Sequence, residues 1–296
     1  MTLLVEVGGH EHRRCYSMSS SPLAQEDLRI TVKRDRNGVV SNWLNDHAAV
    51  GDDIHAAPPA GRFLLRESDR DVVAFAGGSG VTPVFSLIRT ALAGTSRAVR
   101  LLYANRDRDS VIFADALDRL AADYPDRLTV QHHLDDVSGV VVPAEIESFI
   151  TGVDDADYYI CGPAPFMDAV ESSLATSGVP GQRVHVERFT VAEIVAPPAA
   201  NAAATATTEV TIQLDRTTVT VPYRAGNTVL QTARMAGLNA PASCETGSCG
   251  TCIAQVVEGS ARMLNNDALD DDEVADGLIL TCQSLPTSPT ISVIYE

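Results

Sequence analysis

The segment CETGSCGTC, from Cys244 to Cys252, places three cysteines and two glycines within nine residues. Its thiols have the spacing C-x4-C-x2-C, and a fourth cysteine, Cys282, follows further along the chain. Structural zinc sites usually present two separated pairs of ligands. Three ligands on one loop and one outside it is instead the spacing of plant-type [2Fe–2S] centres. We therefore predict a [2Fe–2S] cluster on Cys244, Cys249, Cys252 and Cys282; a structural zinc site and ordinary buried cysteines are the alternatives.

The elements around this loop predict a small domain over residues 209–296. The alternating runs Val210–Leu214 and Thr218–Val221 indicate a β-hairpin, and TVLQTARMAG has apolar residues at helical spacing and ends on Gly237. The chain closes on a strand-like TISVIYE. This region resembles a plant-type ferredoxin domain, which implies a β-grasp fold. The stretch before it, residues 191–208, is rich in Ala, Pro and Thr and indicates a linker.

Composition excludes several classes of function. The 296 residues suffice for two or three domains, and no apolar run approaches membrane-spanning length. The formal net charge of −17 argues against a nucleic-acid partner and favours one with a basic docking face. Cys15 and Cys161 remain outside the cluster pattern and lie far apart in sequence, so we expect no disulfide framework and a cytoplasmic location.

Residues 69–190 alternate strand and helix patterns. Apolar runs such as DVVAFAGG and AVRLLYAN are followed by VFSLIRTALA and SVIFADALDRLAADYP, and the alternation continues to RVHVERF. Such alternation predicts a parallel sheet with helices on both faces, whose ligands bind beyond the carboxyl ends of the strands. GGSGVTP stands at the first of these ends and CGPAPFM at a later one. The glycine-rich turn suits a nucleotide phosphate, although a tight strand-to-helix connection is the alternative.

Together, these two loops resemble the nicotinamide-nucleotide domain of the ferredoxin–NADP reductase superfamily. In that family the first loop receives the pyrophosphate and the second lies near the nicotinamide. Upstream, RRCYSMSSSP contains an R-x-Y-S motif, followed by ITVKR and NGVVSNWL. Placed in this order before the nucleotide domain, these motifs match the family's FAD domain, here residues 1–68.

The R-x-Y-S residues suit a flavin nucleotide. Arg14 can pair with the pyrophosphate, Tyr16 can cover the ring or the ribityl chain, and the hydroxyl of Ser17 can hydrogen-bond flavin N5. We expect Ser41 to cap a short helix whose N-terminus faces phosphate. The family's FAD domain is a six-stranded antiparallel barrel with about fifty residues before this motif. Only thirteen residues precede Arg14, so we expect an incomplete barrel in which TLLVEV is roughly the third strand.

The order of FAD domain, nucleotide domain, linker and ferredoxin domain resembles the reductase components of bacterial multicomponent oxygenases. The phrases RRCYSMSSSP, TVKR, VSNWL, YANRDRDSVIFADAL and GLILTCQS look most like the reductase component of 3-ketosteroid 9-alpha-hydroxylase. The reductase of phenylacetyl-CoA epoxidase is a close second. This resemblance implies an NAD(P)H-dependent oxidoreductase that passes electrons through FAD and a [2Fe–2S] cluster to a terminal oxygenase, expected to be of Rieske type.

The resemblance and the motifs together give the expected sites. The residues expected beside the reacting atoms are Ser17, Thr82, Glu187 and Phe189. The residues expected to bind FAD or the nicotinamide nucleotide are Arg14, Cys15, Tyr16, Ser17, Val32, Lys33, Gly38, Val40, Ser41, Asn42, Gly77, Gly78, Gly80, Thr82, Pro83, Arg106, Cys161, Gly162 and Pro163. Core packing is the alternative for Phe189, and a small buried residue is the alternative for Cys161.

Several features permit two interpretations. Arg106, Arg108 and Ser110 could receive a 2′-phosphate, whereas Asp107 and Asp109 would repel one, and the resemblance favours NADH over NADPH. The acidic run LDDDEVADG is either a docking face or a helix start favoured by the dipole. We interpret the pair His132–His133 as a surface feature at a strand end rather than a metal site. A ferredoxin-type carrier with a non-functional flavin domain is the alternative function.

Overall fold

The computed structural model describes residues 1–24, 27–36, 38–153, 155–189, 207–245, 247 and 249–295. Contacts divide the chain into two compact units. The first comprises Met1, Tyr16–Asp53 and Phe63–Phe189, and the second comprises Thr2–Cys15, Ile54–Arg62 and the described part of Thr190–Glu296. The predicted linker lies almost wholly outside the described residues, so its conformation stays a prediction.

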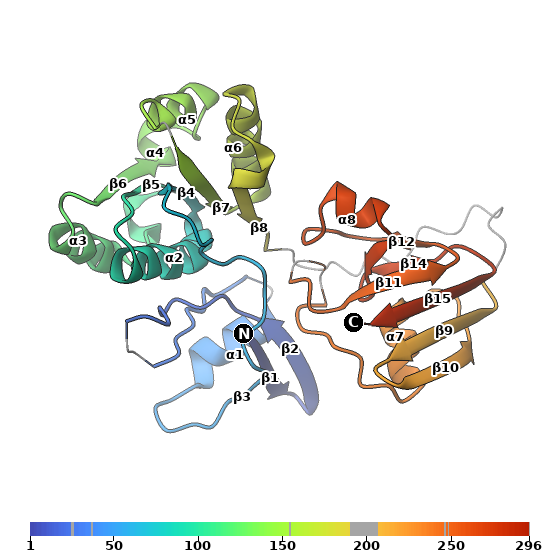
Figure 1. Cartoon of the computed structure of the whole chain (residues 1–296). Helices are drawn as coiled ribbons and strands as arrows, with labels where there is room; N and C mark the ends of the chain where they lie inside the picture. Colours follow the sequence, from blue (N-terminus) through green and yellow to red (C-terminus); the bar gives the residue numbers. More distant parts are fainter. Residues whose placement is uncertain are drawn as a thin grey trace. The chain divides into compact units, whose positions relative to one another are not determined.

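The first unit is built on a parallel sheet of five strands in the order β6-β5-β4-β7-β8 (Figure 1). All four neighbouring pairs run parallel, which confirms the expectation from the strand–helix alternation. The central strands are buried almost throughout because helices cover both faces. The strands are β4 (Asp71–Gly77), β5 (Val99–Asn105), β6 (Leu128–Leu134), β7 (Ala156–Cys161) and β8 (Val184–Glu187).

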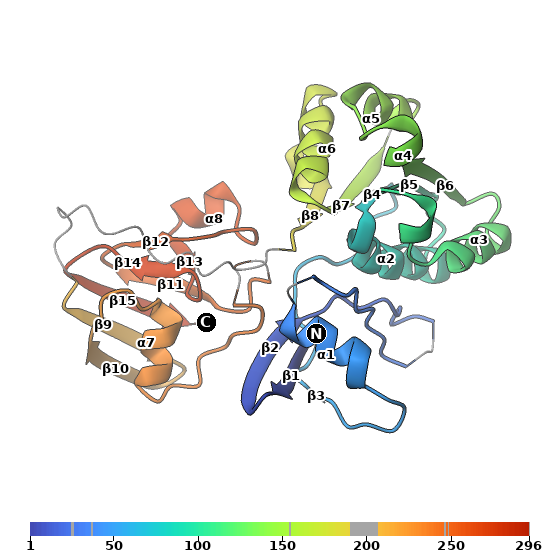
Figure 2. The ribbon, with the colours of Figure 1, turned by 180° about the vertical axis from the view of Figure 1, so that it is seen from behind.

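Helices cover both faces of this sheet (Figure 2). One face packs against α2 (Val81–Gly94) and α3 (Ala114–Asp123). The other packs against α5 (Pro143–Ile150) and α6 (Ala164–Thr176). The sequence patterns above do not predict α5. Its start signals are a proline at the first helical position and Glu145, whose carboxylate accepts from the Val142 N–H at 3.0 Å. Three short segments complete the unit: η1 (Gly78–Gly80), η2 (Arg108–Ser110) and η3 (Gly181–Arg183), with a four-residue helix α4 (Asp135–Ser138) after β6.

The segment after the R-x-Y-S motif packs on α2 within the same unit. The Ser86 hydroxyl donates to the Ser20 carbonyl oxygen at 2.7 Å, and the hydroxyls of Ser21 and Thr90 lie 3.0 Å apart. These contacts hold the serine-rich stretch against α2.

The predicted short helix forms as α1 (Val39–His47), but the expected capping residue is wrong. Gly38 is the N-cap, and Ser41 lies inside the first turn. The Ser41 hydroxyl accepts from the Asp35 N–H at 3.2 Å, so it stabilises the incoming chain rather than the helix start.

The second unit contains an antiparallel sheet in the order β2-β1-β3. It consists of β1 (Thr2–Val7), β2 (His10–Cys15) and the short β3 (His55–Ala56). The predicted strand TLLVEV is β1, whose Leu3 and Val5 are buried. The R-x-Y-S arginine, Arg14, therefore lies on β2 and pairs with Leu3.

The ferredoxin-like part of the second unit is a mixed sheet in the order β10-β9-β15-β11-β13. The hairpin of β9 (Glu209–Leu214) and β10 (Thr217–Pro222) and the closing β15 (Thr290–Tyr295) confirm the expected strands. Helix α7 (Val229–Met235) packs on the sheet, and Gly237 follows it with a φ of 78°, as a C-terminal glycine should. The remaining elements are β11 (Ile253–Glu258), β12 (Ala261–Met263), α8 (Asp271–Ala275), β13 (Leu278–Leu280) and β14 (Ser284–Pro286). Among all the described residues, no helix has the length and apolar character needed to cross a membrane.

Candidate functional site

The four cysteines of the predicted cluster site converge in the second unit. Cys244 and Cys249 belong to the loop between α7 and β11, Cys252 precedes β11, and Cys282 follows β13. Contact with Cys244 raises the pKa of Cys249, and contacts with Cys244 and Cys252 raise that of Cys282. A hydrogen bond from Cys282 lowers the pKa of Cys252. All four sulfurs therefore share one small volume, although Cys282 is distant in sequence.

The four cysteines have the donor type and number that a two-iron cluster needs. Over the described part of the chain, no group of three His, Cys, Asp or Glu side chains has the geometry of a single-ion site. Cys244 contacts both Cys249 and Cys282, and Cys252 also contacts Cys282. A [2Fe–2S] cluster needs two thiolates on each iron. The four convergent thiols supply that number of ligands.

The loop backbone adapts to that arrangement. Gly247 and Gly250 have φ angles of 90° and 70°, which glycine adopts readily. The Cys244 N–H points at the Cys249 sulfur at 3.4 Å, and Thr251 Oγ1 lies 3.2 Å from the same sulfur. Such contacts to sulfur are what a cluster loop requires. The four cysteines would hold the cluster, and the loop would supply hydrogen bonds to it.

In the first unit, Ser17, Cys161 and Glu187 come together. The Ser17 hydroxyl donates to Glu187 Oε2 at 3.0 Å, and Cys161 is the β7 partner of Glu187 on β8. Desolvation raises the pKa of Glu187 to about 7, and the hydrogen bond from Ser17 partly opposes this rise. Burial raises the pKa of the Cys161 thiol, which is fully buried. A carboxyl with a raised pKa thus lies beside the hydroxyl that is predicted to contact the flavin.

The glycines of the two predicted nucleotide loops allow those loops to pack on each other. A Cβ at Gly80 would overlap the Cys161 carbonyl group and lie 2.7 Å from Gly162 N. A Cβ at Gly77 would lie 2.6 Å from Pro163 Cδ. Close loop packing therefore explains these glycines at least as directly as phosphate approach. Both loops follow carboxyl ends of adjacent strands, where parallel sheets bind ligands.

Two further groups near this edge suit a nucleotide. A Cβ at Gly78, which has a φ of 52°, would lie 3.6 Å from Nζ of Lys33, the chain's single lysine. Asn105 ends β5 and is 4% exposed, and neither polar atom of its side chain has a partner with good hydrogen-bond geometry among the described residues, although its side chain lies near enough to the Tyr103 hydroxyl to oppose in part the rise that burial causes in the pKa of Tyr103. Buried amides normally have partners, so Asn105 is a candidate ligand that our sequence reasoning missed. A polar residue ending an apolar strand was the available signal.

The charged segment that follows β5, residues 106–110, makes local hydrogen bonds. Asp107 is the N-cap of η2, and its carboxylate accepts from the Ser110 N–H at 2.8 Å. The Ser110 hydroxyl donates to the Asp107 carbonyl oxygen at 2.7 Å. Ser110 is therefore committed to the turn, which weakens the argument for a 2′-phosphate site on it.

The other predicted residues lie as follows. Phe189 is 46% exposed, so the core-packing alternative is wrong. Thr82 and Pro83 are buried in the first turn of α2. Cys15 is exposed, and Arg14, also exposed, donates to the Arg13 carbonyl oxygen at 2.7 Å.

Residues around α1 make mostly structural contacts. Asn42 accepts from Arg34 at 3.2 Å and donates to the Gly38 carbonyl oxygen at 2.7 Å. Val40 is buried, and the Val32 carbonyl oxygen accepts from Asn45 at 3.4 Å. Tyr16 pairs through its backbone with Met1, and Arg106 is exposed.

The histidine pair departs from expectation at one residue. His132 is exposed, but His133 is buried, with Nε2 2.7 Å from the Gly139 carbonyl oxygen, so the surface interpretation of His133 is wrong. In the acidic run, Asp270 caps α8 by accepting from the Glu273 N–H at 2.8 Å. This contact supports the helix-start interpretation for Asp270.

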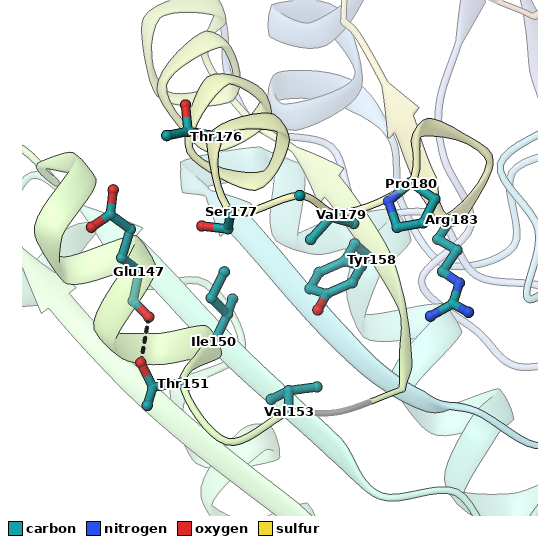
Figure 3. A pocket seen from close by; sticks show the side chains of 11 residues that line it. Glu147, Ile150, Thr151, Val153, Tyr158, Thr176, Ser177, Val179, Pro180 and Arg183 are labelled. Atoms are coloured by element: carbon teal, nitrogen blue, oxygen red, sulfur yellow. Dashed lines mark hydrogen bonds between the residues drawn. The ribbon is translucent and has the colours of Figure 1, made fainter.

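A cleft of about 650 Å³ opens elsewhere on the first unit (Figure 3). Val153 and Tyr158 line it near the start of β7, and Val179 and Pro180 line it before β8. These residues lie at the amino ends of the strands, opposite the loops that contain Gly80 and Gly162. The cleft is therefore not the nucleotide site.

Models of three protein families match successive parts of the chain. An oxidoreductase FAD-binding domain matches residues 1–64, an oxidoreductase NAD-binding domain matches 75–172, and a 2Fe-2S iron-sulfur cluster binding domain matches 212–287. Phthalate dioxygenase reductase, described as a modular structure for electron transfer from pyridine nucleotides to [2Fe–2S], has 29% identity and a TM-score of 0.62. The structural match spans 99% of this chain and 86% of the phthalate dioxygenase reductase chain.

Two curated relatives cover most of the chain. The 3-ketosteroid-9-alpha-monooxygenase, ferredoxin reductase component, of Mycobacterium tuberculosis is 42% identical over 286 residues, which is 96% of this chain and 80% of the relative. A component of the 1,2-phenylacetyl-CoA epoxidase of Escherichia coli is 30% identical over 100% of this chain and 87% of the relative.

The fold and these matches define an NAD(P)H-dependent oxidoreductase with FAD-binding, NAD-binding and [2Fe–2S] domains. The chain belongs to the family of ferredoxin reductase components of 3-ketosteroid-9-alpha-monooxygenase. Its function is electron transfer from NAD(P)H to the oxygenase component of a monooxygenase system.

Proposed function

We propose that this reductase uses NADH and supplies a Rieske-type oxygenase that hydroxylates a 3-ketosteroid at carbon 9. The 42% identity to the mycobacterial steroid monooxygenase reductase supports the steroid over a phenylacetyl-CoA substrate, for which the relative is 30% identical. The six cysteines form no disulfide with one another, which supports a reducing, cytoplasmic compartment. A reductase does not touch the oxidised substrate, so the substrate assignment depends on the partner.

The hydrogen bond between Ser17 and Glu187 is the observation that carries the flavin-site proposal. Bound FAD would accept hydride and release electrons singly, and a bound [2Fe–2S] cluster would carry one electron at a time. Ser17 would orient the flavin by donating to N5. Glu187, with its pKa of about 7, would accept a stronger hydrogen bond from Ser17 when ionised and a weaker one when protonated.

Other residues of this site would hold the nucleotide. Gly77, Gly80 and Gly162 keep the two loops close together, so both can face one ligand. The ammonium of Lys33 near Gly78 suits a phosphate, and the buried amide of Asn105 suits a polar group of the nucleotide. Arg14 and Tyr16 would bind FAD, and the exposed ring of Phe189 would lie at the nicotinamide side.

The test is reconstitution of the complete electron path. We would supply the FAD-loaded chain with NADH or NADPH and measure reduction of ferricyanide, then couple it to a purified 3-ketosteroid 9-alpha-monooxygenase oxygenase and measure hydroxylated product. We expect NADH to be preferred and product to form. A phenylacetyl-CoA oxygenase serves as the matched partner control. Product with that partner alone would contradict the steroid assignment, and failure to oxidise either nucleotide would favour the carrier hypothesis.

A further inference from the structure

Glu245 adopts an unusual backbone conformation beside the first predicted cluster ligand. It follows Cys244 directly and has a φ of 58°. Among the described residues, only Phe113, Asp215 and Glu245 combine a side chain with a left-handed φ. A non-glycine residue there is disfavoured unless other contacts hold it. The backbone of the loop is thus strained at the residue that directly follows Cys244.

Three hydrogen bonds hold Glu245 in place. Arg234 donates from Nη2 to Oε1 at 2.8 Å and from Nη1 to Oε2 at 3.1 Å, which is the two-pronged geometry of a strong arginine–carboxylate pair. The side-chain amide of Gln283 donates to the Glu245 carbonyl oxygen at 2.7 Å. Because Gln283 follows Cys282, Glu245 is linked both to α7 and to the segment that carries the fourth predicted ligand.

Arg234 extends from a rigid element. Its helix, α7, is anchored by the buried side chains of Val229, Leu230 and Ala233. The helix start is stabilised by a reciprocal cap, in which Gln231 N–H donates to the Thr228 hydroxyl at 3.2 Å. The packed helix therefore holds Arg234 in place, and Arg234 can hold the loop that contains Glu245.

Arg234 lies within electrostatic range of Cys282, the fourth predicted ligand. The hydrogen bond to Glu245 is the main cause of the raised pKa of Arg234. A cluster gains one negative charge on reduction, so a guanidinium nearby stabilises the reduced form and a carboxylate nearby destabilises it. In the pair, the two effects oppose each other.

We propose that Arg234 is a positioning residue for electron transfer. It holds Glu245 in its left-handed conformation, and its positive charge raises the reduction potential of the cluster that the four cysteines hold. The proposal rests on the cluster assignment. Neither side of the pair touches the reacting atoms, so Arg234 acts through the loop and through its charge. Both effects can be measured without coupling to an oxygenase.

The test uses the full chain with its cluster and begins with iron and sulfide per chain in the parent. If the parent lacks a cluster, the cluster assignment fails and the inference falls with it. If the cluster is present, we compare Arg234→Gln, Arg234→Lys and Glu245→Gln with Arg216→Gln. Arg216 is exposed in the turn between β9 and β10, so its variant removes the same charge elsewhere in the sheet.

We expect Arg234→Gln to lower the cluster's reduction potential and Glu245→Gln to raise it. A tenfold change in the one-electron equilibrium constant corresponds to about 59 mV, and shifts of this order are expected. Arg234→Lys should have a reduction potential close to that of the parent, because lysine keeps the positive charge. It should lose iron to a chelator faster than the parent, because lysine cannot form the bidentate pair with Glu245. Arg216→Gln should resemble the parent in both measurements.

A double variant separates the conformational effect from the charge effect. Arg234→Gln should lose iron to the chelator about tenfold faster than the parent, the factor expected for a lost charge-assisted hydrogen bond. Glycine needs no latch in the left-handed region, so Arg234→Gln combined with Glu245→Gly should retain iron as the parent does. The proposal is overturned if Arg234→Gln matches Arg216→Gln in potential and iron loss, or if the glycine gives no rescue.

Discussion

The Ser17 hydroxyl donates a 3.0 Å hydrogen bond to the carboxylate of Glu187, a residue 170 positions away in the chain. Ser17 belongs to the R-x-Y-S motif, and Glu187 ends the last strand of the parallel sheet. The pair joins the predicted flavin segment to the nucleotide domain within one compact unit. This contact motivates the first two predictions.

Replacing Ser17 by alanine should slow flavin reduction. Loss of one positioned donor typically costs about 10²–10³-fold in rate, so we expect a decrease of this order in the NADH-dependent bleaching of bound FAD, measured by stopped flow. Ser17→Thr keeps a hydroxyl and should be much less impaired. Ser172→Ala removes an exposed serine of α6 and is the control. Equal rates for Ser17→Ala and Ser172→Ala at full FAD occupancy would disprove the role of Ser17.

Glu187 should make the stability of the first unit pH-dependent. Its pKa is raised from 4.5 to about 7, so between these values the unfolded chain is ionised while the folded chain keeps its proton. Stability should fall as pH rises through this window and become level above it. At 1.36 kcal/mol for each pH unit, the total loss is about 3 kcal/mol.

The measurement is thermal unfolding of flavin-depleted parent and Glu187→Gln at pH 4 and pH 8. Glutamine retains an oxygen that accepts from Ser17 but does not titrate, so the variant should be the more stable protein at pH 8 only. A constant difference across both pH values would show that ionisation of Glu187 is not the cause.

Replacing Cys282 should remove the cluster. Its sulfur contacts Cys244 and Cys252, so Cys282→Ser leaves three thiols where four are needed. We expect iron per chain to fall severely and ferricyanide reduction by NADH to persist, since that reaction needs only the flavin. Cys15→Ser, at an exposed cysteine, is the matched control and should keep its iron. Full iron and sulfide in Cys282→Ser would refute the ligand assignment.

Gly80→Ala should destabilise the nucleotide domain. The added Cβ would overlap the Cys161 carbonyl group, and because the obstacle is backbone on both sides, one loop must move. Overpacking of this kind costs about 1–3 kcal/mol. Gly181→Ala is the control, because its Cβ would meet nothing within 4 Å. Chemical unfolding of both variants measures the difference, and NADH binding should weaken in Gly80→Ala alone. Equal stability of the two would indicate that the loops can separate freely.

Several features of this protein were determined by the sequence itself. Cysteine spacing is a local property of one loop, so C-x4-C-x2-C indicated an iron–sulfur centre without a structure. Strand–helix alternation reflects burial on both faces of a parallel sheet, and the runs DVVAFAGG, AVRLLYAN and RVHVERF correctly predicted β4, β5 and β8. The hairpin of β9 and β10 and the glycine after α7 followed from equally local patterns.

Only the tertiary structure decided which distant groups meet. Burial depends on neighbours from elsewhere in the chain, which is why His133 is buried, Phe189 is exposed and the polar side chain of Asn105 is enclosed at the end of a strand. The pKa of Glu187 and its contact with Ser17 exist because two segments fold together. In the same way, Arg234 and Glu245 are unremarkable in sequence, and their pairing arises because α7 packs beside the strained loop. Local sequence patterns determine the helices and strands, whereas tertiary packing determines which side chains meet and how their pKa values shift.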